Sequence, residues 1–520
     1  MEHTDAAAPS AANKWLVALA VMLATLIEVL DMTIANVALD HIRGSLSAGV
    51  DEAAWVLTSY IVANAIVIPL SGWLGNLFGR KRFFTACILL FTASSFLCGA
   101  APTLESLVFF RVLQGLAGGS LMPVSQAILM ETFPAREQAM AMAVWGVGMM
   151  VGPVLGPILG GWITDNYSWR WIFFINLPFG TLAAVLVTFI LHDAHYVSRK
   201  IKRIDWWGLV LLVLGVGALQ IMLDKGERAD WFNSNLIVCL AIIAAVGLCA
   251  FVIQELRSKE PVVDLHVFNN RSFAVGTVFT TVIMFGMYGT FALIPLYCQL
   301  VAGYTPFLSG EVLSVQTCGT FVSVLLAGRL FHRFDPRFLV CFGCIVAGIG
   351  AWDMTHFNPS TGFWEIARPG FLRGMGSGFI FIPLTTLALG SVPRERMGAA
   401  SGLFNMVRTI GGGIGIALLI AFLSRGAQIH QSYLVGHIHN YNPELWRRFA
   451  LATSSASLGM TDSATIGPPF LSLVYGEVQR QALLMSFVDD FRIIAFIFFL
   501  LSPVVFLMRR PQLPGSAPAH

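Results

Sequence analysis

The sequence predicts an all-α protein that crosses a membrane about 14 times. Hydrophobic residues make up 56% of its 520 residues and charged residues only 12%, and its mean hydropathy of +0.73 is too high for a soluble globular protein. The apolar runs are roughly 20 residues long, about twice the length of a barrel strand. Because each backbone polar group in lipid must be satisfied within its own segment, these spans are expected to be helices.

The predicted spans follow one another as apolar runs that end at short polar, basic or glycine-containing connections. The first six lie near 15–39, 53–74, 83–101, 104–127, 139–164 and 171–191. Two further runs, near 205–224 and 235–255, form a closely spaced pair. The last six lie near 272–298, 308–331, 337–355, 370–390, 400–423 and 486–508.

A weak internal sequence similarity predicts how these spans are grouped. The stretch Gly72–Arg82 after the second span resembles Gly328–Arg337 after the tenth. Such internal similarities suggest two parallel structural repeats with a substrate site between them. Counting six spans from each end leaves the middle pair as an insertion. The predicted units are a tail over 1–14, a six-helix bundle over 15–191, an inserted hairpin over 205–255, a second six-helix bundle over 272–508 that includes a long polar segment at 424–485, and a tail over 509–520.

Lysine and arginine accumulate on alternate connections, which predicts the orientation of the chain. Examples are the cluster Arg80–Arg82, Arg136, Arg333 and Arg394. Short loops rich in these residues stay in the cytoplasm, so both termini are expected there and the 424–485 segment on the outside. In a bacterium, this describes a multi-pass protein of the inner membrane.

The composition also argues against other classes of protein. A net charge of +3, with basic residues scattered between apolar runs, gives no nucleic-acid surface. All eight cysteines fall in apolar runs, and the pair Cys341 and Cys344 has no second pair or histidine nearby, so neither a metal nor another cofactor is expected. No nucleophile paired with a base and no nucleotide-binding loop is visible, so no catalytic residues are assigned and an enzyme is not expected.

Two acidic residues, Glu28 and Asp31, lie three positions apart inside the first span. A charged side chain at the membrane centre costs about 2.5–3.5 kcal/mol on insertion scales, so this pair is expected to have a function. Residues three apart share a helix face, and both burial and a second carboxylate favour the protonated form of a carboxylic acid. The pair is therefore expected to bind and release protons near neutral pH. The alternative is a structural acid neutralised by a local hydrogen bond.

Four stretches together resemble a known family over nearly the whole chain. They are Leu30–Leu39 in the first span, Gly72–Arg82 after the second, Arg111–Gly119 in the fourth and Gly148–Gly161 in the fifth. The chain resembles the major facilitator superfamily, specifically its fourteen-helix drug:proton antiporters of the EmrB and QacA type. The resemblance implies a fold of two six-helix bundles and an exporter that uses inward proton flow to expel hydrophobic or amphipathic drugs by alternating access. Asp31 matches the family's acidic position.

The resemblance also implies roles for a membrane arginine and for a loop. Arg111 is a fixed positive charge in the fourth span that would alter the proton affinity of a nearby acid; the alternative is an arginine that snorkels to headgroups or binds backbone carbonyls. The loop after the second span would gate the cytoplasmic mouth, through Gly72, Asn76, Gly79, Arg80, Lys81 and Arg82. Asn76 replaces the family's usual aspartate, which favours the alternative that the basic residues only anchor the loop.

The fifth span is implied to be the family's antiporter motif, a pliable seam between the halves that prevents leak. Its residues are Gly148, Gly152, Pro153, Gly156, Pro157, Gly160 and Gly161. Ordinary close packing of helices is the compatible alternative, because four-residue glycine spacing allows close approach and proline allows a bend.

Nine further polar residues in the spans can either line a substrate cavity or join helices by hydrogen bonds. They are Asn36, Asn64, Gln114, Gln126, Asn176, Gln220, Gln316, Asn405 and Arg408.

The implied partners are an amphipathic substrate, protons and membrane lipid. An EmrB-like setting adds a periplasmic adaptor protein and an outer-membrane channel, with the 424–485 segment as a contact surface; this rests on analogy. Two other functions stay open. One is a dedicated exporter of one metabolite class, such as a siderophore, fatty acid or organic acid. The other is a non-transport membrane enzyme or sensor, which the lack of recognisable catalytic groups disfavours.

Overall fold

The computed structural model describes residues 11–191, 205–258, 260–331, 333–437, 447 and 463–507. Within these ranges every regular element is a helix, and 14 helical segments are long and apolar enough to cross a membrane. The predicted all-α class with about 14 spans is confirmed. The predicted C-terminal tail, most of the N-terminal tail and the middle of the 424–485 segment lie outside the described residues.

The N-terminal half holds six membrane-spanning segments built from ten helical elements. These are α1 (Ala11–Ser45), α2 (Val50–Val67), η1 (Ile68–Leu70), α3 (Ser71–Phe78), α4 (Arg80–Ala100), α5 (Leu104–Gly118), α6 (Leu121–Thr132), α7 (Gln138–Asn166), α8 (Trp171–Phe174) and α9 (Asn176–Ile190). The second span passes from α2 to α3 through the 3-10 turn η1, which contains Pro69, a residue that cannot donate a backbone hydrogen bond. The turn from α3 into α4 is made by Gly79 at φ +84°, a conformation that favours glycine.

The remaining helices form the inserted hairpin and the C-terminal half. The hairpin is α10 (Trp206–Lys225), η2 (Trp231–Asn233) and α11 (Asn235–Arg257). The C-terminal half contains η3 (Leu265–Asn269), α12 (Arg271–Leu300), α13 (Pro306–Leu330), α14 (Pro336–Asp353), η4 (Met354–His356), α15 (Phe363–Gly390), η5 (Arg394–Arg396), α16 (Met397–Val435), α18 (Ser463–Val504) and η6 (Val505–Leu507).

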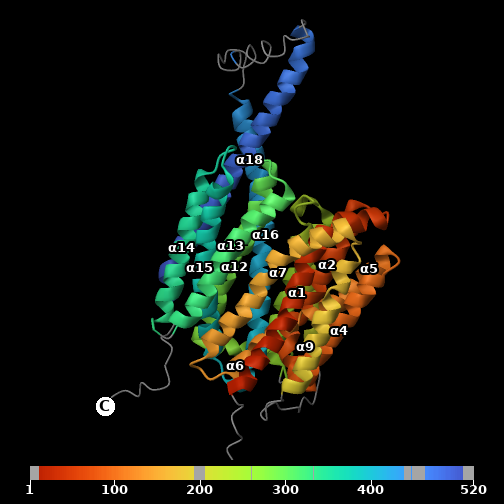
Figure 1. Ribbon diagram of the computed structural model, residues 1–520, viewed down its shortest axis with the longest axis vertical. Helices are drawn as coiled ribbons and strands as arrows, with labels where there is room; N and C mark the ends of the chain where they lie inside the picture. The colour runs from red at the N-terminus through yellow and green to blue at the C-terminus, as the bar shows by residue number, and fades with distance from the viewer. Residues whose placement is uncertain are drawn as a thin grey trace, which may run out of the picture.

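The two halves lie side by side (Figure 1). In the N-terminal half α1 packs along α7 and α2 along α5, while in the C-terminal half α15 packs between α13 and α14, and α12 along α16. The hairpin contacts both halves. Its helix α10 meets α2, where the Thr58 hydroxyl donates to the Asp224 carboxylate at 2.5 Å, and its Trp231 packs against Ala417 and Ala421 of α16.

The halves pack tightly together at one end, which we call the basic end because its loops carry Arg80, Arg136, Arg333 and Arg394. A Cβ atom at Gly72 would meet the backbone of Gly398 across the halves, and one at Gly328 of α13 would meet Ala143 of α7 at 2.8 Å. The largest buried apolar cluster joins the halves at this level and includes Trp145, Ile382 and Phe404. Toward the opposite end, by contrast, Leu155 and Ile158 of α7 are exposed.

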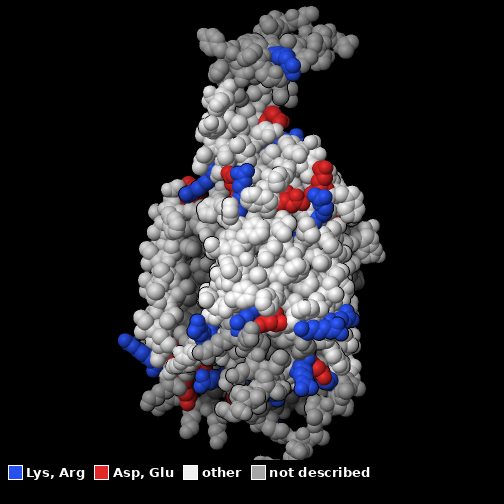
Figure 2. Space-filling model, turned by 90° about the vertical axis from the view of Figure 1, so that its left-hand side faces the viewer, with Lys and Arg blue, Asp and Glu red and all other residues white. Residues whose placement is uncertain are grey.

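Two helices project beyond the bundle at the end opposite the basic end, where Figure 1 shows α16 and α18 extending past their neighbours. Helix α16 has 39 residues and α18 has 42, whereas about 20 residues cross a bilayer. Both extend well past the predicted spans, into the segment expected to be external. Figure 2 shows an apolar belt between two bands of charged residues, as expected for a protein surrounded by lipid.

Candidate functional site

Asp31 lies at the centre of a hydrogen-bonded cluster inside the N-terminal half. Its carboxylate accepts from Arg111 Nη1 at 2.6 Å through one oxygen. The other oxygen accepts from the amide of Gln114 at 2.9 Å and from that of Asn176 at 2.7 Å. The Asp31 side chain is 0% exposed and that of Arg111 is 1% exposed. We call these four residues the Asp31 cluster; both oxygens of its acid are occupied by donors.

Arg111 is held on several sides. Its Nε donates to the carbonyl of Val56 at 3.0 Å and its Nη1 also to Gln114 Oε1 at 2.8 Å, while its guanidinium carbon lies 4.2 Å from the centroid of the Tyr60 ring. A buried ion pair forms only where further hydrogen bonds compensate the loss of water, and these contacts supply them. At 1% exposure Arg111 does not snorkel to the headgroups, whereas the other part of the structural alternative, a bond to a backbone carbonyl, is present at Val56 beside the ion pair.

Three helices supply the Asp31 cluster. Asp31 projects from α1, Arg111 and Gln114 from consecutive turns of α5, and Asn176 from the first turn of α9. Asn176 also donates to Ser95 Oγ of α4 at 3.0 Å, and Ser95 in turn donates to the carbonyl of Phe173 at 2.8 Å. The cluster therefore ties four helices of one half to a single carboxylate.

Glu28 has different surroundings from Asp31, although the sequence placed both on one face. Its Oε1 accepts from Asn64 of α2 at 3.1 Å, and its Oε2 is buried with no hydrogen-bond partner among the described residues. Glu28 lies beside the Met122 backbone of α6 and within electrostatic reach of Arg408 on α16. The hydrogen bonds of both acids thus stay within the N-terminal half, but Glu28 also has a charged neighbour, Arg408, in the C-terminal half.

Polar residues of α6 and α16 form hydrogen bonds between the two halves. Asn405 donates to Gln126 Oε1 at 2.5 Å, and the Ser401 hydroxyl donates to the Pro123 carbonyl at 2.7 Å. Arg408 contacts the sulfur of Met122, while its Nε and Nη1 are buried without a hydrogen-bond partner among the described residues. Three of the predicted polar residues therefore lie where the two halves contact each other: Gln126, Asn405 and Arg408.

The predicted gating loop contacts both halves at the basic end. Arg80 forms a buried ion pair with Glu131 of α6, and Gly72 packs directly on the Gly398 backbone of α16. Asn76 is half-buried on α3, Lys81 is half-buried and Arg82 is exposed. The loop is thus packed into the protein through Gly72 and Arg80, which anchoring by surface charge alone does not explain.

The glycines of the predicted antiporter motif face a different neighbour from the one expected. A seam between the halves was expected, but Cβ atoms at Gly148, Gly152, Gly156 and Gly160 would meet Met22, Val29, Thr33 and Ile34 of α1, respectively, in the same half. No atom lies within 4 Å of a Cβ at Gly161. Pro153 is half-buried and Pro157 lies within α7. Residues nearer the start of α7 face the C-terminal half instead: Ala143 lies beside Gly328, and Gly146 beside Val324 and Ile382.

The remaining predicted polar residues are dispersed. Asn36 is exposed on α1, Gln220 of the hairpin lies beside Gly413 of α16, and Gln316 of α13 packs on Gly374 of α15. Gln114 and Asn176 bind Asp31, so they do not line a cavity independently of it.

The sequence analysis assigned no role to three charged residues that are buried or half-buried in the structure. Glu131, near the end of the fourth span, pairs with Arg80. Arg373 is 1% exposed in the C-terminal half, with one long contact of 3.4 Å to the Gly286 carbonyl, and Asp490 has a buried Oδ2 without a partner among the described residues. A charge in an apolar run was the available signal for Arg373 and Asp490; no spacing indicated the partner of Glu131.

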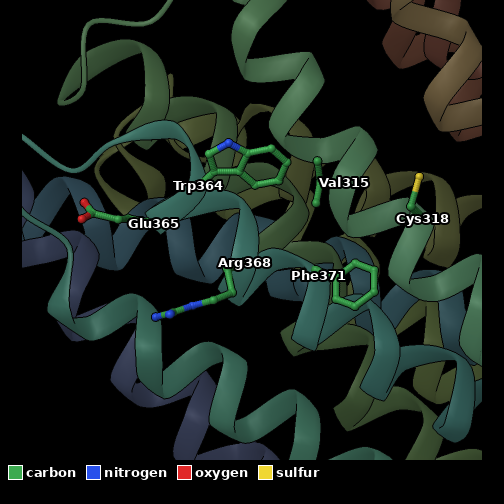
Figure 3. A pocket seen from close by; sticks show the side chains of 6 residues that line it. All are labelled: Val315, Cys318, Trp364, Glu365, Arg368 and Phe371. Atoms are coloured by element: carbon green, nitrogen blue, oxygen red, sulfur yellow. The ribbon is translucent and has the colours of Figure 1, made fainter.

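A cavity of about 560 Å³ lies between α13 and α15 (Figure 3). It is lined by Val315, Cys318, Trp364, Glu365, Arg368 and Phe371. Its charged groups are engaged locally, because Arg368 lies 3.3 Å from Asp353 and Glu365 accepts from the Gly362 N–H at 2.9 Å. None of the residues singled out from the sequence as sites lines it.

Comparisons with known proteins agree with this architecture. The family model of the Major Facilitator Superfamily matches residues 21–416. Multidrug export protein EmrB of Haemophilus influenzae is 44% identical over 431 residues, which cover 82% of this chain and 84% of that protein. Fatty acid resistance protein FarB of Neisseria gonorrhoeae is 37% identical over 508 residues, covering 97% of this chain and 98% of that protein.

A solved structure shares the fold. The proton:xylose symporter XylE matches with a TM-score of 0.61 at 12% sequence identity, covering 95% of each chain. At that identity the likeness concerns the fold alone. With 14 membrane-spanning segments, the family match and full-length relatives, this is a multi-pass membrane protein. The chain belongs to the Major Facilitator Superfamily, among its EmrB-like members.

Proposed function

We propose that this protein is a proton-coupled secondary exporter of hydrophobic or amphipathic drugs that works by alternating access. The observation that carries the proposal is the buried ion pair of Asp31 and Arg111 within the membrane-spanning part of the fold. A membrane protein keeps such charges in hydrocarbon only where they are paired, and they mark ion or proton pathways. The printed function of the EmrB relative, multidrug export, supports the substrate class.

The Asp31 cluster can convert protonation into movement. A deprotonated Asp31 accepts three hydrogen bonds, from α5 and α9. When Asp31 takes up a proton, the attraction to Arg111 is lost and one oxygen becomes a donor, so the donors that face it must rearrange. The contacts of Arg111 with Val56 and Gln114 keep the guanidinium hydrogen-bonded in that state. Protonation therefore changes how α1 is held against its neighbours, which is the differential contact that coupling requires.

The packing of the two halves supports an outward-facing arrangement in this proposal. Contacts between the halves concentrate at the basic end, through Gly72 with Gly398 and Gly328 with Ala143. In alternating access the halves rock about a site between them. The Gly72–Gly398 contact would open when the protein faces inward, and the Arg80–Glu131 pair would keep the loop attached to the N-terminal half throughout.

We place the protein in the bacterial inner membrane with the basic end in the cytoplasm. The arginine-rich loops around Arg80, Arg136 and Arg394 support this orientation. Both termini would then be cytoplasmic, since an even number of spans returns the chain to the same side. Reporter fusions at Arg136 and at Asn233, in loops of opposite side, test it: a cytoplasmic reporter should be active only in the first.

The proposal includes a periplasmic adaptor protein and an outer-membrane channel. The projection of α16 and α18 beyond the bundle supports a contact surface at the outer end, where Tyr433 and Tyr475 are exposed. A cysteine placed at Tyr433 should cross-link to the adaptor in intact cells, and one at Phe189, exposed on the flank of α9, should not. Equal yields from both positions would contradict the assignment.

The exporter function is tested in inverted membrane vesicles that have been energised. Adding a transported drug should release protons from the vesicle lumen, because export in this orientation carries drug inward and protons out. Vesicles without the protein provide the control. If a broad panel of drugs that the protein confers resistance to releases no protons, the proposed coupling is wrong.

A dedicated exporter of fatty acids is the second candidate, favoured by the FarB relative, which is named for fatty acid resistance and spans nearly the whole chain. The same vesicles separate the two. Proton release by medium-chain fatty acids alone would support the dedicated exporter, and release by chemically unrelated drugs would support the multidrug one.

A further inference from the structure

We propose that a pocket at the basic end binds the headgroup of an anionic phospholipid, and that this lipid bridges the two halves. The pocket, which we call the arginine pocket, is lined by Arg136, Arg329 and Arg333 among other residues. It shares no residue with the Asp31 cluster. Binding of the lipid is independent of the proposed exporter function, whereas its effect on the two halves rests on alternating access.

The arginine pocket lies between the N-terminal and C-terminal halves. Its volume is about 490 Å³, within the range of roughly 300–1,000 Å³ that is usual for small-molecule sites. Trp15 of α1, Arg136 just before α7 and Met140 of α7 line it from the N-terminal half. Arg329 of α13 and Arg333, three residues beyond the end of α13, line it from the C-terminal half. A ligand in this pocket therefore touches both halves at once.

The charge of the pocket favours an anion. Its three arginines are exposed, and none of them forms an ion pair with a described residue. Glu137 also lines the pocket, but its carboxylate lies 2.6 Å from Nζ of Lys14, which neutralises it. The guanidinium group presents a planar set of donors that matches the oxygens of a phosphate. The arginine pocket thus offers three positive charges that no acid of the described residues balances.

The surface of α13 that leads to the pocket fits a lipid better than a free anion. Val322, Leu326 and Arg329 are spaced by four and three residues, so they lie on one face of the helix. Val322 is 42% exposed and Leu326 is 38% exposed, and both are apolar. Along this face, exposed apolar side chains are followed by exposed arginines at the basic end. An acyl chain fits the apolar part, and the phosphate of the same molecule fits the arginines.

The aromatic side chain of the pocket agrees with this depth in the membrane. Trp15 is 38% exposed and lines the pocket beside the arginines. Tryptophan is enriched at the level of the lipid headgroups, and basic pockets between transmembrane helices on the cytoplasmic side bind anionic headgroups. The apolar belt in Figure 2 ends at a band of charged residues. The arginine pocket therefore has the composition expected where acyl chains give way to headgroups.

The two flanks of the contact between the halves differ in what covers them. The inserted hairpin lies against the flank formed by α2 and α16, because its helix α10 contacts both of these helices. The arginine pocket is on the flank formed by α7 and α13, and no residue of the hairpin lines it. Lipid can thus approach the contact between the halves at α7 and α13.

A lipid bound in the arginine pocket should favour closure of the basic end. The pocket includes Gly328, where a Cβ atom would meet Ala143 of α7 at 2.8 Å. If the halves separate at this point, Arg136 moves away from Arg329 and Arg333, and one headgroup no longer reaches all three. The lipid therefore binds the closed arrangement more tightly, and only such a difference in affinity shifts a conformational equilibrium.

The test of the site is equilibrium binding of phosphatidylglycerol to the purified, delipidated full-length protein, measured by native mass spectrometry. Phosphatidylcholine has the same phosphate but no net charge, and it should bind more weakly. Inorganic phosphate has no acyl chains, and it should not displace phosphatidylglycerol. Equal binding of the two lipids, or displacement by inorganic phosphate, would overturn the assignment of an anionic lipid.

A pair of matched double variants locates the binding. Arg329→Gln combined with Arg333→Gln should weaken phosphatidylglycerol binding at least about tenfold, because each arginine beside an anionic headgroup contributes roughly fivefold in affinity. The control combines Arg394→Gln with Arg396→Gln, which removes two exposed arginines of the same end that do not line the pocket. It should bind the lipid as the parent does. Equal losses in both double variants would show a response to overall charge and would contradict a specific site.

The effect on the halves has its own readout. A cysteine introduced at the buried Ala127 of α6, beside the contact of Gly72 with Gly398, reports opening of the basic end by thiol labelling. In lipid nanodiscs, phosphatidylglycerol should slow the labelling relative to phosphatidylcholine in the parent background, and not in the background of Arg329→Gln with Arg333→Gln. Equal labelling rates in the two lipids, with phosphatidylglycerol bound, would overturn the bridging role. The exporter proposal fails separately, if adding drug moves no protons.

Discussion

The Nη1 atom of Arg111 lies 2.6 Å from a carboxylate oxygen of Asp31, and both side chains are sealed from solvent. The pair connects α5 to α1, and Gln114 and Asn176 complete its hydrogen bonds. Arginine cannot readily lose its proton, so the state of the pair is decided by Asp31 alone. This arrangement makes one proton sufficient to weaken the contact between two helices.

Replacing Arg111 tests whether its charge or its shape matters. Arg111→Lys keeps the charge but loses the Nε contact with Val56, so it should retain part of the drug-driven proton release. Arg111→Ala leaves Asp31 buried without its counter-ion and should lower the free energy of unfolding by about 3–5 kcal/mol and abolish coupling. Full exchange by Arg111→Ala would reassign this residue to a purely structural role.

Asn176 should contribute to the stability of the fold through its hydrogen bond to Asp31. Asn176→Ala removes a donor at 2.7 Å from a buried carboxylate and should lower the free energy of unfolding by about 1–3 kcal/mol, as measured by thermal unfolding in detergent. The control is Asn166→Ala at the exposed end of α7, where the amide binds the carbonyl of Trp162. Equal destabilisation by the two variants would contradict the role given to Asn176.

The packing of α7 on α1 depends on glycine at specific positions. A Cβ at Gly156 would overlap the Thr33 side chain, whereas nothing lies within 4 Å of one at Gly161. Gly156→Ala should therefore cost about 1–3 kcal/mol of stability through overpacking, and Gly161→Ala should be close to neutral. A thermal shift in Gly161→Ala as large as in Gly156→Ala would show that this face does not pack as described.

Gly72 should hold the basic end closed. Gly72→Ala places a methyl group against the Gly398 backbone, while Gly75→Ala leaves its nearest neighbour, Arg80 Cγ, at 3.6 Å. The first variant should shift the population toward states open at the basic end, and the second should not. Thiol labelling of a cysteine introduced at the buried Ala127, beside this contact, should rise in the Gly72→Ala background only.

The sequence predicted what depends on length and polarity along the chain. Fourteen apolar runs of spanning length predicted the fold class. Asp31 and Arg111 were predicted as functional residues because a charged side chain within the membrane has a high free-energy cost. The structure brings the two within ion-pair distance although they are 80 residues apart. The amides of Gln114 and Asn176 were predicted only as residues that line a cavity or join helices, because a neutral amide costs little in either role.

The sequence could not predict which neighbouring helix a given helix face contacts. Four-residue spacing predicted that Gly148, Gly152, Gly156 and Gly160 share a face, but not that this face meets α1. Likewise, Glu28 and Asp31 lie three residues apart, yet only Glu28 is within electrostatic reach of Arg408 in the other half, whereas Asp31 binds residues of its own half. Partners far away in the chain, such as Glu131 for Arg80, follow only from the packing of α3 and α4 against α6.

The proton-coupling role of Asp31 is tested most directly by comparing the parent with Asp31→Asn in energised inverted vesicles. Asparagine preserves the size of the side chain but cannot take up a proton, so drug addition should release protons from vesicles of the parent and none from those of the variant. The variant should still be present in the membrane at the level of the parent, as judged by immunoblotting. Proton release by Asp31→Asn at the rate of the parent would show that the coupling proton binds elsewhere.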